Sequence, residues 1–160
     1  MKQFLIFVLV AWSGSVAAQS GAVISKVRFC GTEYAVPAGC TAQSEYEVRC
    51  SSYAIQWIPT LEKASVSLSE KLIANTEQQQ DPSKRSLYEK KQVKVLLANQ
   101  PATACYRINY MGRDGKMTHK LIAYGIVSGQ SVCVILSSEN ELDTNSDIPS
   151  FAGKIIQFVT

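Results

Sequence analysis

The chain has 160 residues, of which 16 are lysine or arginine and 13 are aspartate or glutamate, so its formal charge is +3. This charge is too small to indicate nucleic acid as a partner, since nucleic-acid-binding domains carry a marked basic excess. A chain of this length is the usual size of one domain with one hydrophobic core.

The N-terminal segment MKQFLIFVLVAWSGSVAA has the three parts of a secretory signal peptide. Lys2 supplies the positive start, Phe4 to Trp12 the apolar stretch, and Ala18 the small residue before cleavage. The apolar stretch is too short to span a bilayer, and no second one follows, so no membrane span is expected. We predict a cleaved signal peptide over residues 1–18, a single domain over residues 19–160, and a periplasmic or secreted location.

The first predicted strands belong to an antiparallel sheet. Residues 23–29 alternate apolar and polar side chains, which is typical of a half-buried strand. Further on, a tight turn at Ser51-Ser52 would pair Val48 with Ile55, and both apolar side chains then fall on one face.

The cysteines indicate an oxidising compartment in which disulfides form, and their odd number leaves at least one thiol unpaired within a monomer. If Tyr34 pairs with Val48, Cys30 and Cys50 become diagonal neighbours, and Gly31 permits the bend that joins them. The sequence therefore predicts a Cys30–Cys50 disulfide and leaves the other three cysteines unassigned. The five are Cys30, Cys40, Cys50, Cys105 and Cys133.

A long amphipathic helix of about five turns is predicted after Pro59, with Thr60 as its cap. Its apolar residues recur at steps of three and four, which places them on one helix face. Residues 93–97 then alternate as a strand, and the lysines around it suit an edge, where charge discourages stray pairing. The residues of the helical stripe are Leu61, Ala64, Leu68 and Leu72.

Residues 105–136 are the most regular part of the chain and predict three consecutive strands. A two-residue turn at Asp114-Gly115 would pair Tyr110 with His119. A second turn at Ser128-Gly129 pairs Ile122 with Ile135. Together the two registers determine which side chains of the three strands share a face.

The first face is almost purely apolar, and we assign it to the core beneath the helices. It holds Tyr106, Ile108, Tyr110, Leu121, Ala123, Val132, Val134 and Leu136. The second face mixes apolar anchors with polar residues, which is the composition of a protein interface. The alternative interpretation is that a loop of the same chain covers this second face. The residues predicted to bind a partner are Arg107, Asn109, Ile122, Tyr124, Ile126 and Ile135.

His119 is the sole histidine of the chain. The predicted register turns Cys105 and Cys133 away from it, so no Cys–His catalytic pair is expected. Since no other catalytic signature is present, the protein is predicted not to be an enzyme, and no cofactor is expected.

The polar stretch after the third strand is an alternative partner-binding loop. Asp143, Asn145 and Asp147 have the first spacings of an EF-hand, but Ile148 stands where Gly is required and Lys154 where Glu is required. No metal site is therefore predicted. The acidic residues of this loop are Glu139, Glu141, Asp143 and Asp147.

A last helix is predicted from the stripe Ile148, Phe151, Ile155 and Phe158. The fold class is then α+β: an antiparallel β-sheet with one long and one C-terminal helix packed mainly on one face.

In signal, size and layout the chain resembles the small periplasmic immunity and inhibitor proteins of bacteria, and its strand–helix–strand order is similar to PsbP/Mog1-like domains. That resemblance implies an exported, non-enzymatic domain whose partner is a protein, most simply a secreted hydrolase whose active site it occludes. Two alternatives stay open. One is a secreted hydrolase with an unrecognised site, and the other is a carrier that holds a small apolar ligand between helix and sheet.

Overall fold

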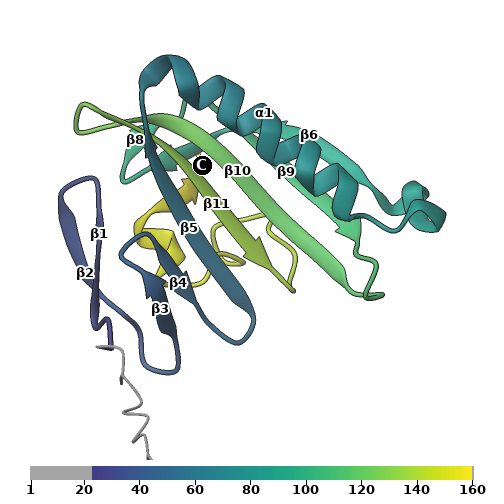
Figure 1. Ribbon diagram of the computed structural model, residues 1–160, viewed down its shortest axis with the longest axis horizontal. Coiled ribbons are helices and arrows are strands. Elements are labelled where there is room, and N and C mark those ends of the chain that lie inside the picture. The colour runs from purple at the N-terminus through teal and green to yellow at the C-terminus, as the bar shows by residue number, and fades with distance from the viewer. Residues whose placement is uncertain (1–22, 160) are drawn as a thin grey trace, which may run out of the picture.

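The computed structural model describes residues 23–159 and has a large antiparallel sheet crossed on one face by a long helix (Figure 1). The antiparallel sheet and the long helix confirm the α+β prediction at that level. We call the face that carries the helix the helix side, and the other face the far side. In spatial order the seven strands are β3 (Thr41–Ser44), β4 (Glu47–Arg49), β5 (Tyr53–Thr60), β11 (Gln130–Ser138), β10 (Met117–Val127), β9 (Ala104–Met111) and β6 (Glu89–Val93).

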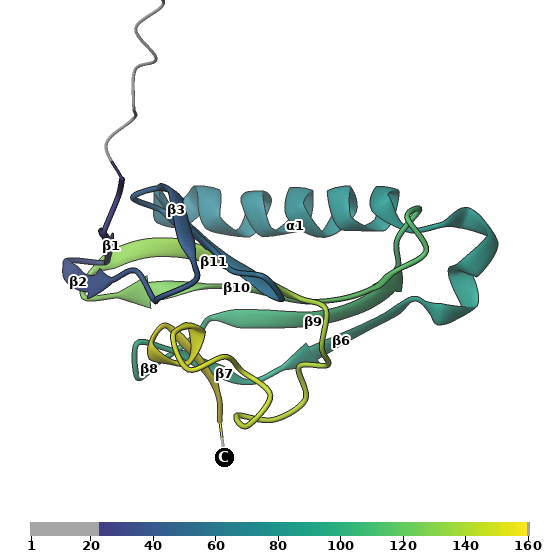
Figure 2. The same ribbon diagram turned by 90° about the horizontal axis from the view of Figure 1, so that it is seen from below.

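Smaller elements surround this sheet. The hairpin of β1 and β2 forms a two-stranded sheet, and β12, β7 and β8 form a three-stranded sheet on the far side (Figure 2). The remaining elements are β1 (Lys26–Phe29), β2 (Thr32–Ala35), α1 (Glu62–Gln79), β7 (Val95–Leu97), β8 (Gln100–Pro101), β12 (Ile156–Phe158), and the 3-10 helices Pro82–Leu87 and Ala152–Lys154.

The hairpin of β10 and β11 has the predicted register. Ser128 and Gly129 form its two-residue turn with positive φ angles of 51° and 77°. A two-residue turn with both φ angles positive matches the twist of the strands that it joins. The pairing of Ile122 with Ile135 is confirmed.

The hairpin of β9 and β10 differs from the prediction by one residue. Tyr110 pairs with Thr118 instead of His119, because five residues, 112–116, form the loop in place of two. Bonds from Gly112 N to Lys116 O (2.8 Å) and from Gly115 N to Gly112 O (3.0 Å) close this wider loop. A shift of one residue exchanges the faces of a strand. The side chains of β9 therefore exchange faces relative to those of β10 and β11. Ile108 and Tyr110 lie beneath α1 as predicted, but with Ile122, whereas Leu121, Ala123, Val132, Val134 and Leu136, predicted for that face, lie on the far side.

The helix side is covered by α1, whose Ile73 packs with Ile108, Ile122 and neighbouring residues in a separate apolar cluster. The sheet-facing stripe is rotated from the predicted one. Leu61 is the N-cap and is 81% exposed, whereas Ser65 and Ser69 are buried. Serine suits these buried positions because its small side chain lets the helix approach the sheet closely. Its hydroxyl can also bond to a carbonyl of the same helix, as Ser69 Oγ does when it donates to Val66 O at 2.7 Å.

The far side carries the main core. Leu121, Val134 and Leu136 are fully buried there. They pack in one cluster with residues of the β1–β2 hairpin, β7, β12 and the C-terminal segment. The sheet is thus a middle layer between α1 and the small sheet that contains β7 and β8, as Figure 2 shows.

The disulfide joins Cys40 to Cys50, so the predicted Cys30–Cys50 pair is wrong. The reason is strand pairing. β2 pairs with β1 and leaves β4 to pair with β3, where Thr41 lies opposite Arg49. That register brings the next pair of residues, Cys40 and Cys50, to a Cα separation of 4.3 Å. Cys30 is an unpaired thiol at the β1–β2 turn.

The predicted C-terminal helix is also wrong. The apolar residues Ile148, Phe151 and Ile155 are buried, as the stripe predicted, but Ala152–Lys154 is a single 3-10 turn. The chain then extends into β12, which pairs antiparallel with β7. The stripe thus identified burial correctly, whereas a neighbouring strand edge determined the backbone conformation.

Candidate functional site

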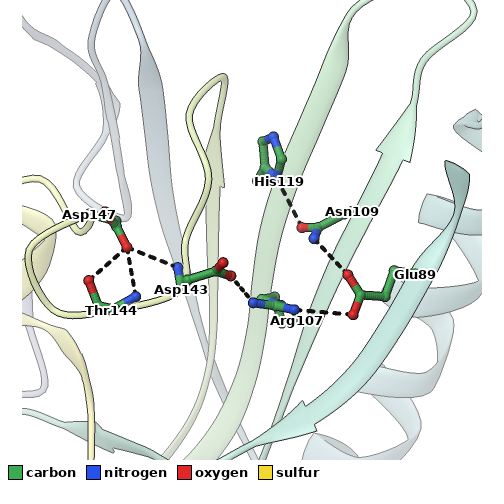
Figure 3. A network of polar contacts seen from close by, with 7 residues as sticks. All are labelled: Glu89, Arg107, Asn109, His119, Asp143, Thr144 and Asp147. Carbon is green, nitrogen blue, oxygen red and sulfur yellow. Dashed lines mark hydrogen bonds and ion pairs between the residues drawn. The ribbon is translucent and has the colours of Figure 1, made fainter.

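A chain of polar contacts lies on the far side of the sheet and ends in the loop after β11 (Figure 3). Arg107 of β9 is at its centre. Its Nη2 contacts Glu89 Oε1 of β6 at 3.2 Å, and its Nη1 forms an ion pair with Asp143 of the loop. The Arg107 side chain is only 14% exposed. A guanidinium held this deeply between two carboxylates fixes the position of both.

The contacts continue along the sheet from Glu89 to Asn109 and His119. Asn109 Nδ2 donates to Glu89 Oε2 at 3.1 Å, so its Oδ1 is the acceptor that faces His119 Nδ1 at 3.0 Å. His119 therefore carries its proton on Nδ1. Burial lowers the pKa of His119; Arg107 also lowers it, and Glu141 acts in the opposite direction. His119 as a whole is 6% exposed, and its hydrogen bond to Asn109 orients the imidazole.

The acidic loop, residues 139–147, is anchored at several points. Leu142 is fully buried in the core, and Asp143 is paired with Arg107. The carboxylate of Asp147 accepts from Thr144 N at 2.7 Å and from Thr144 Oγ1 at 2.8 Å. These contacts give the loop a defined shape without regular secondary structure.

Asn145 attaches the same loop to the edge of β12. Its Oδ1 accepts from Phe158 N at 2.7 Å, and its Nδ2 donates to Phe158 O at 3.0 Å. The amide thus makes the two bonds that a neighbouring strand would make. One side chain here both orders the loop and protects a strand edge.

The acidic residues of the loop are exposed to solvent while its backbone is anchored. Glu139 Oε1 lies 3.6 Å from Lys116 Nζ, and this solvent-exposed ion pair contributes little to stability. Glu141 forms no ion pair with another described residue. The chain as a whole is basic, with a formal charge of +3. The loop therefore carries a local excess of exposed negative charge.

The six residues predicted to share a partner-binding face do not share one. Arg107 and Asn109 lie on the far side, because the register of β9 differs from the predicted one. Ile122 lies on the helix side with an exposure of 1%. Tyr124 and Ile135 are half-buried against the same helix-side cluster.

Ile126 is the exception among these six, since it is 43% exposed. The helix-side residues are thus covered by α1 over most of their length, and the mixed composition came from combining two faces. The alternative loop is different, because Glu139, Glu141, Asp143 and Asp147 are all exposed.

The cysteines do not complete a catalytic pair with His119. Cys105 shares its face but lies opposite Ala123, four residues along β10, which is about 13 Å at the rise of a strand. Burial raises the pKa of Cys105, and burial raises the pKa of Cys133 to about 12. Neither thiol would be ionised near neutral pH, which makes both poor nucleophiles.

Within residues 23–159, no group of three or more His, Cys, Asp or Glu side chains is placed to hold a metal ion. Over the same residues no helix is long and apolar enough to cross a membrane. The predicted signal peptide, residues 1–18, lies outside the described residues.

Sequence reasoning found the acidic loop but missed what anchors it. Glu89 was not singled out, and Arg107 and Asn109 were placed on one face with Ile122, which lies on the other face. The available signal in the sequence was the pair of glycines, because Gly112 and Gly115 together permit a wider turn than Asp114-Gly115 alone.

No protein-family model matches this chain, and no curated protein matches it.

Proposed function

We propose that this protein is an exported, non-enzymatic binding domain that occludes the active site of a secreted hydrolase, as periplasmic inhibitor and immunity proteins do. The acidic loop, residues 139–147, is the part that enters the cleft of the partner. The observation that carries the proposal is the anchoring of this loop by Arg107, Leu142 and Asn145 while its carboxylates stay exposed.

Preorganisation is the physical reason why such a loop suits binding. A mobile loop loses conformational entropy when a partner orders it, at roughly 1 kcal/mol for each side chain that is immobilised. The anchored loop has already lost much of that freedom on folding. Its carboxylates also favour fast association with a basic cleft, because opposite charges steer the encounter.

The compartment agrees with this role. The Cys40–Cys50 disulfide indicates an oxidising environment. The N-terminal sequence predicts export to the periplasm or beyond the cell. Secreted hydrolases act in that environment, so inhibitor and target would meet there.

The test begins with the partner. The mature protein is immobilised, the proteins that it retains from an extract of its source organism are identified by mass spectrometry, and the retained hydrolase is purified. We expect inhibition at one-to-one stoichiometry. The double variant Glu139→Gln with Glu141→Gln should bind at least tenfold more weakly, because these exposed carboxylates have no anchoring role.

The matched control is Glu62→Gln with Glu70→Gln, two exposed carboxylates on α1. It removes the same charge from the other side of the sheet and should leave binding unchanged. Asn145→Ala keeps every loop charge but removes both bonds to Phe158, and it should also weaken binding. Retention of no hydrolase, or equal weakening by the two double variants, would contradict the proposal.

A secreted hydrolase is the second candidate, and His119 is the observation that favours it. Asn109 and Glu89 orient its imidazole and leave Nε2 without a hydrogen-bond partner among the described residues. A base in that state could accept a proton from a nucleophile. Under the inhibitor proposal His119→Gln retains full function. Loss of function at unchanged thermal stability would favour the hydrolase.

A further inference from the structure

The strand β6 is an open edge of the seven-stranded sheet. It pairs with β9 on one side, and no described strand pairs with its other side. Four of its five residues, Glu89–Gln92, are exposed. An unpaired strand edge can bind an extended segment of another chain through backbone hydrogen bonds.

The backbone groups available at this edge follow from the neighbouring contacts. Lys94, the residue after β6, accepts a hydrogen bond from Val159 N at 3.1 Å, so its carbonyl points to the outer side. The groups of successive residues in an antiparallel strand point alternately to the two sides. The N–H and C=O groups of Gln92 and Lys90 therefore also point outward. They provide two donors and two acceptors for an added strand.

The next strand along the chain, β7, already has another strand paired with its corresponding edge. β12 pairs antiparallel with the outer side of β7, where Phe158 lies opposite Val95. The bond from Val159 N to Lys94 O is its last contact in the described residues. A strand added to β6 would thus continue the line of β12.

A cavity of about 690 Å³ lies where the edge of β6 meets this small sheet. Most of its lining is apolar, so it can take an aliphatic side chain of an added segment. One cation, Lys94, stands at its border. Among the residues that line it are Gln92, Val93, Lys94, Ala102, Thr103 and Val159.

The charge of this edge indicates which segment it fits. Lys91 and Lys94 are exposed and form no ion pair with another described residue. Lys84 and Arg85, in the 3-10 helix before β6, are also exposed and also form no ion pair with another described residue. Four unpaired cations near one strand edge attract an acidic chain and repel a basic one.

We propose that the outer edge of β6 binds an extended, acidic segment of a partner protein as an added strand, with an aliphatic side chain of that segment in the neighbouring cavity. This site is separate from the acidic loop, and its charge is opposite. Lysines keep unrelated strands away from the edge, while a segment with matching carboxylates overcomes that barrier.

Binding of a fluorescein-labelled hexapeptide, Glu-Val-Glu-Val-Glu-Val, measured by anisotropy at low salt, tests this proposal. We expect saturable one-to-one binding that weakens at least tenfold when lysine replaces glutamate in the peptide. Two further peptides are N-methylated at alternate peptide bonds, in opposite phases. Only the phase that faces β6 should lose binding, because N-methylation removes the donors used in the ladder.

Two protein variants locate the site. Gln92→Pro removes an outward N–H that β9 does not use, so the sheet should stay intact while peptide binding is lost. Lys91→Glu with Lys94→Glu should also abolish binding without any change to the backbone. The control, Lys63→Glu with Lys71→Glu, reverses two exposed charges on α1 and should leave binding unchanged.

Three results would overturn the proposal. The first is the absence of saturable binding by the acidic peptide. The second is equal binding by both methylated peptides, which would indicate charge attraction without a ladder. The third is concentration-dependent dimerisation of the protein that Gln92→Pro abolishes, since a second copy of this chain would then be the occupant.

Discussion

Ile122→Ala tests whether α1 covers the helix side of the sheet in solution. Ile122 is 1% exposed and packs in the cluster that α1 closes. The substitution removes three carbons, which is about 2.4 kcal/mol of transfer free energy, and the cavity left behind adds about 1 kcal/mol. The free energy of unfolding should therefore fall by about 3 to 4 kcal/mol, with a Tm lower by about 10 °C.

Ile126→Ala is the matched control for this prediction. Ile126 lies on the same strand and the same face, four residues away, but is 43% exposed. Its truncation should cost about 1 kcal/mol, because much of the side chain is already in water. Urea unfolding of residues 19–160 can be followed by the fluorescence of Trp57, which is buried and is the one tryptophan in that segment.

The comparison between the two variants has a clear contrary result. If Ile122→Ala costs no more than Ile126→Ala, α1 does not cover the sheet, and the helix side is free to bind a partner. That outcome would return Ile122, Tyr124 and Ile135 to the candidate binding residues, beside the acidic loop.

Replacing Cys40 and Cys50 together by alanine should lower the free energy of unfolding by about 2 to 3 kcal/mol, because the disulfide closes a loop of sequence separation 10. Urea unfolding measures this change, and an unchanged unfolding midpoint would mean that the disulfide does not form. The folded-state pKa of His119 is lowered, so its contribution to stability is present above its unfolded pKa of about 6.5 and is lost as the pH falls below that value towards the folded pKa. A plot of unfolding free energy against pH should show this loss for the wild type and not for His119→Gln, and parallel curves would refute the burial of the imidazole. Arg107→Met should speed hydrogen exchange in residues 139–147 and leave exchange in α1 unchanged, whereas equal rates in both proteins would show that this arginine does not anchor the loop.

The sequence was sufficient where one local feature determines the structure. The turn at Ser128-Gly129 has two residues that adopt positive φ, and this requirement alone sets the register of β10 and β11. The long helix was also predicted within a few residues of its observed bounds, Glu62–Gln79. In both cases the signal lies within a short stretch of sequence and does not depend on distant strands.

The sequence was insufficient where two local solutions compete. The stretch from Met111 to Met117 contains Asp114-Gly115, a strong two-residue turn signal, yet the chain uses a five-residue loop that Gly112 also closes. The difference of one residue in register reversed the face of β9. A small local choice thus changed which side chains of β9 and β10 share a face.

Long-range pairing explains the other errors. Cys50 has two possible partners, Cys30 and Cys40, and the choice between β2 and β3 as the neighbour of β4 distinguishes them. The apolar residues near the C-terminus likewise predict burial but not conformation. A strand that pairs with β7 and a helix that packs on a sheet can bury the same residues.

Arg107 explains why the far side of the sheet carries charge within a largely apolar layer. A guanidinium with so little exposure needs carboxylates close by, because an unpaired buried charge is strongly destabilising. One carboxylate, Glu89, comes from the edge strand β6, and the other, Asp143, from the acidic loop. The same side chain therefore links the two surfaces to which we assign binding. Any partner that repositions Glu89 at the edge of the sheet changes the electrostatic environment that holds Asp143 in the loop.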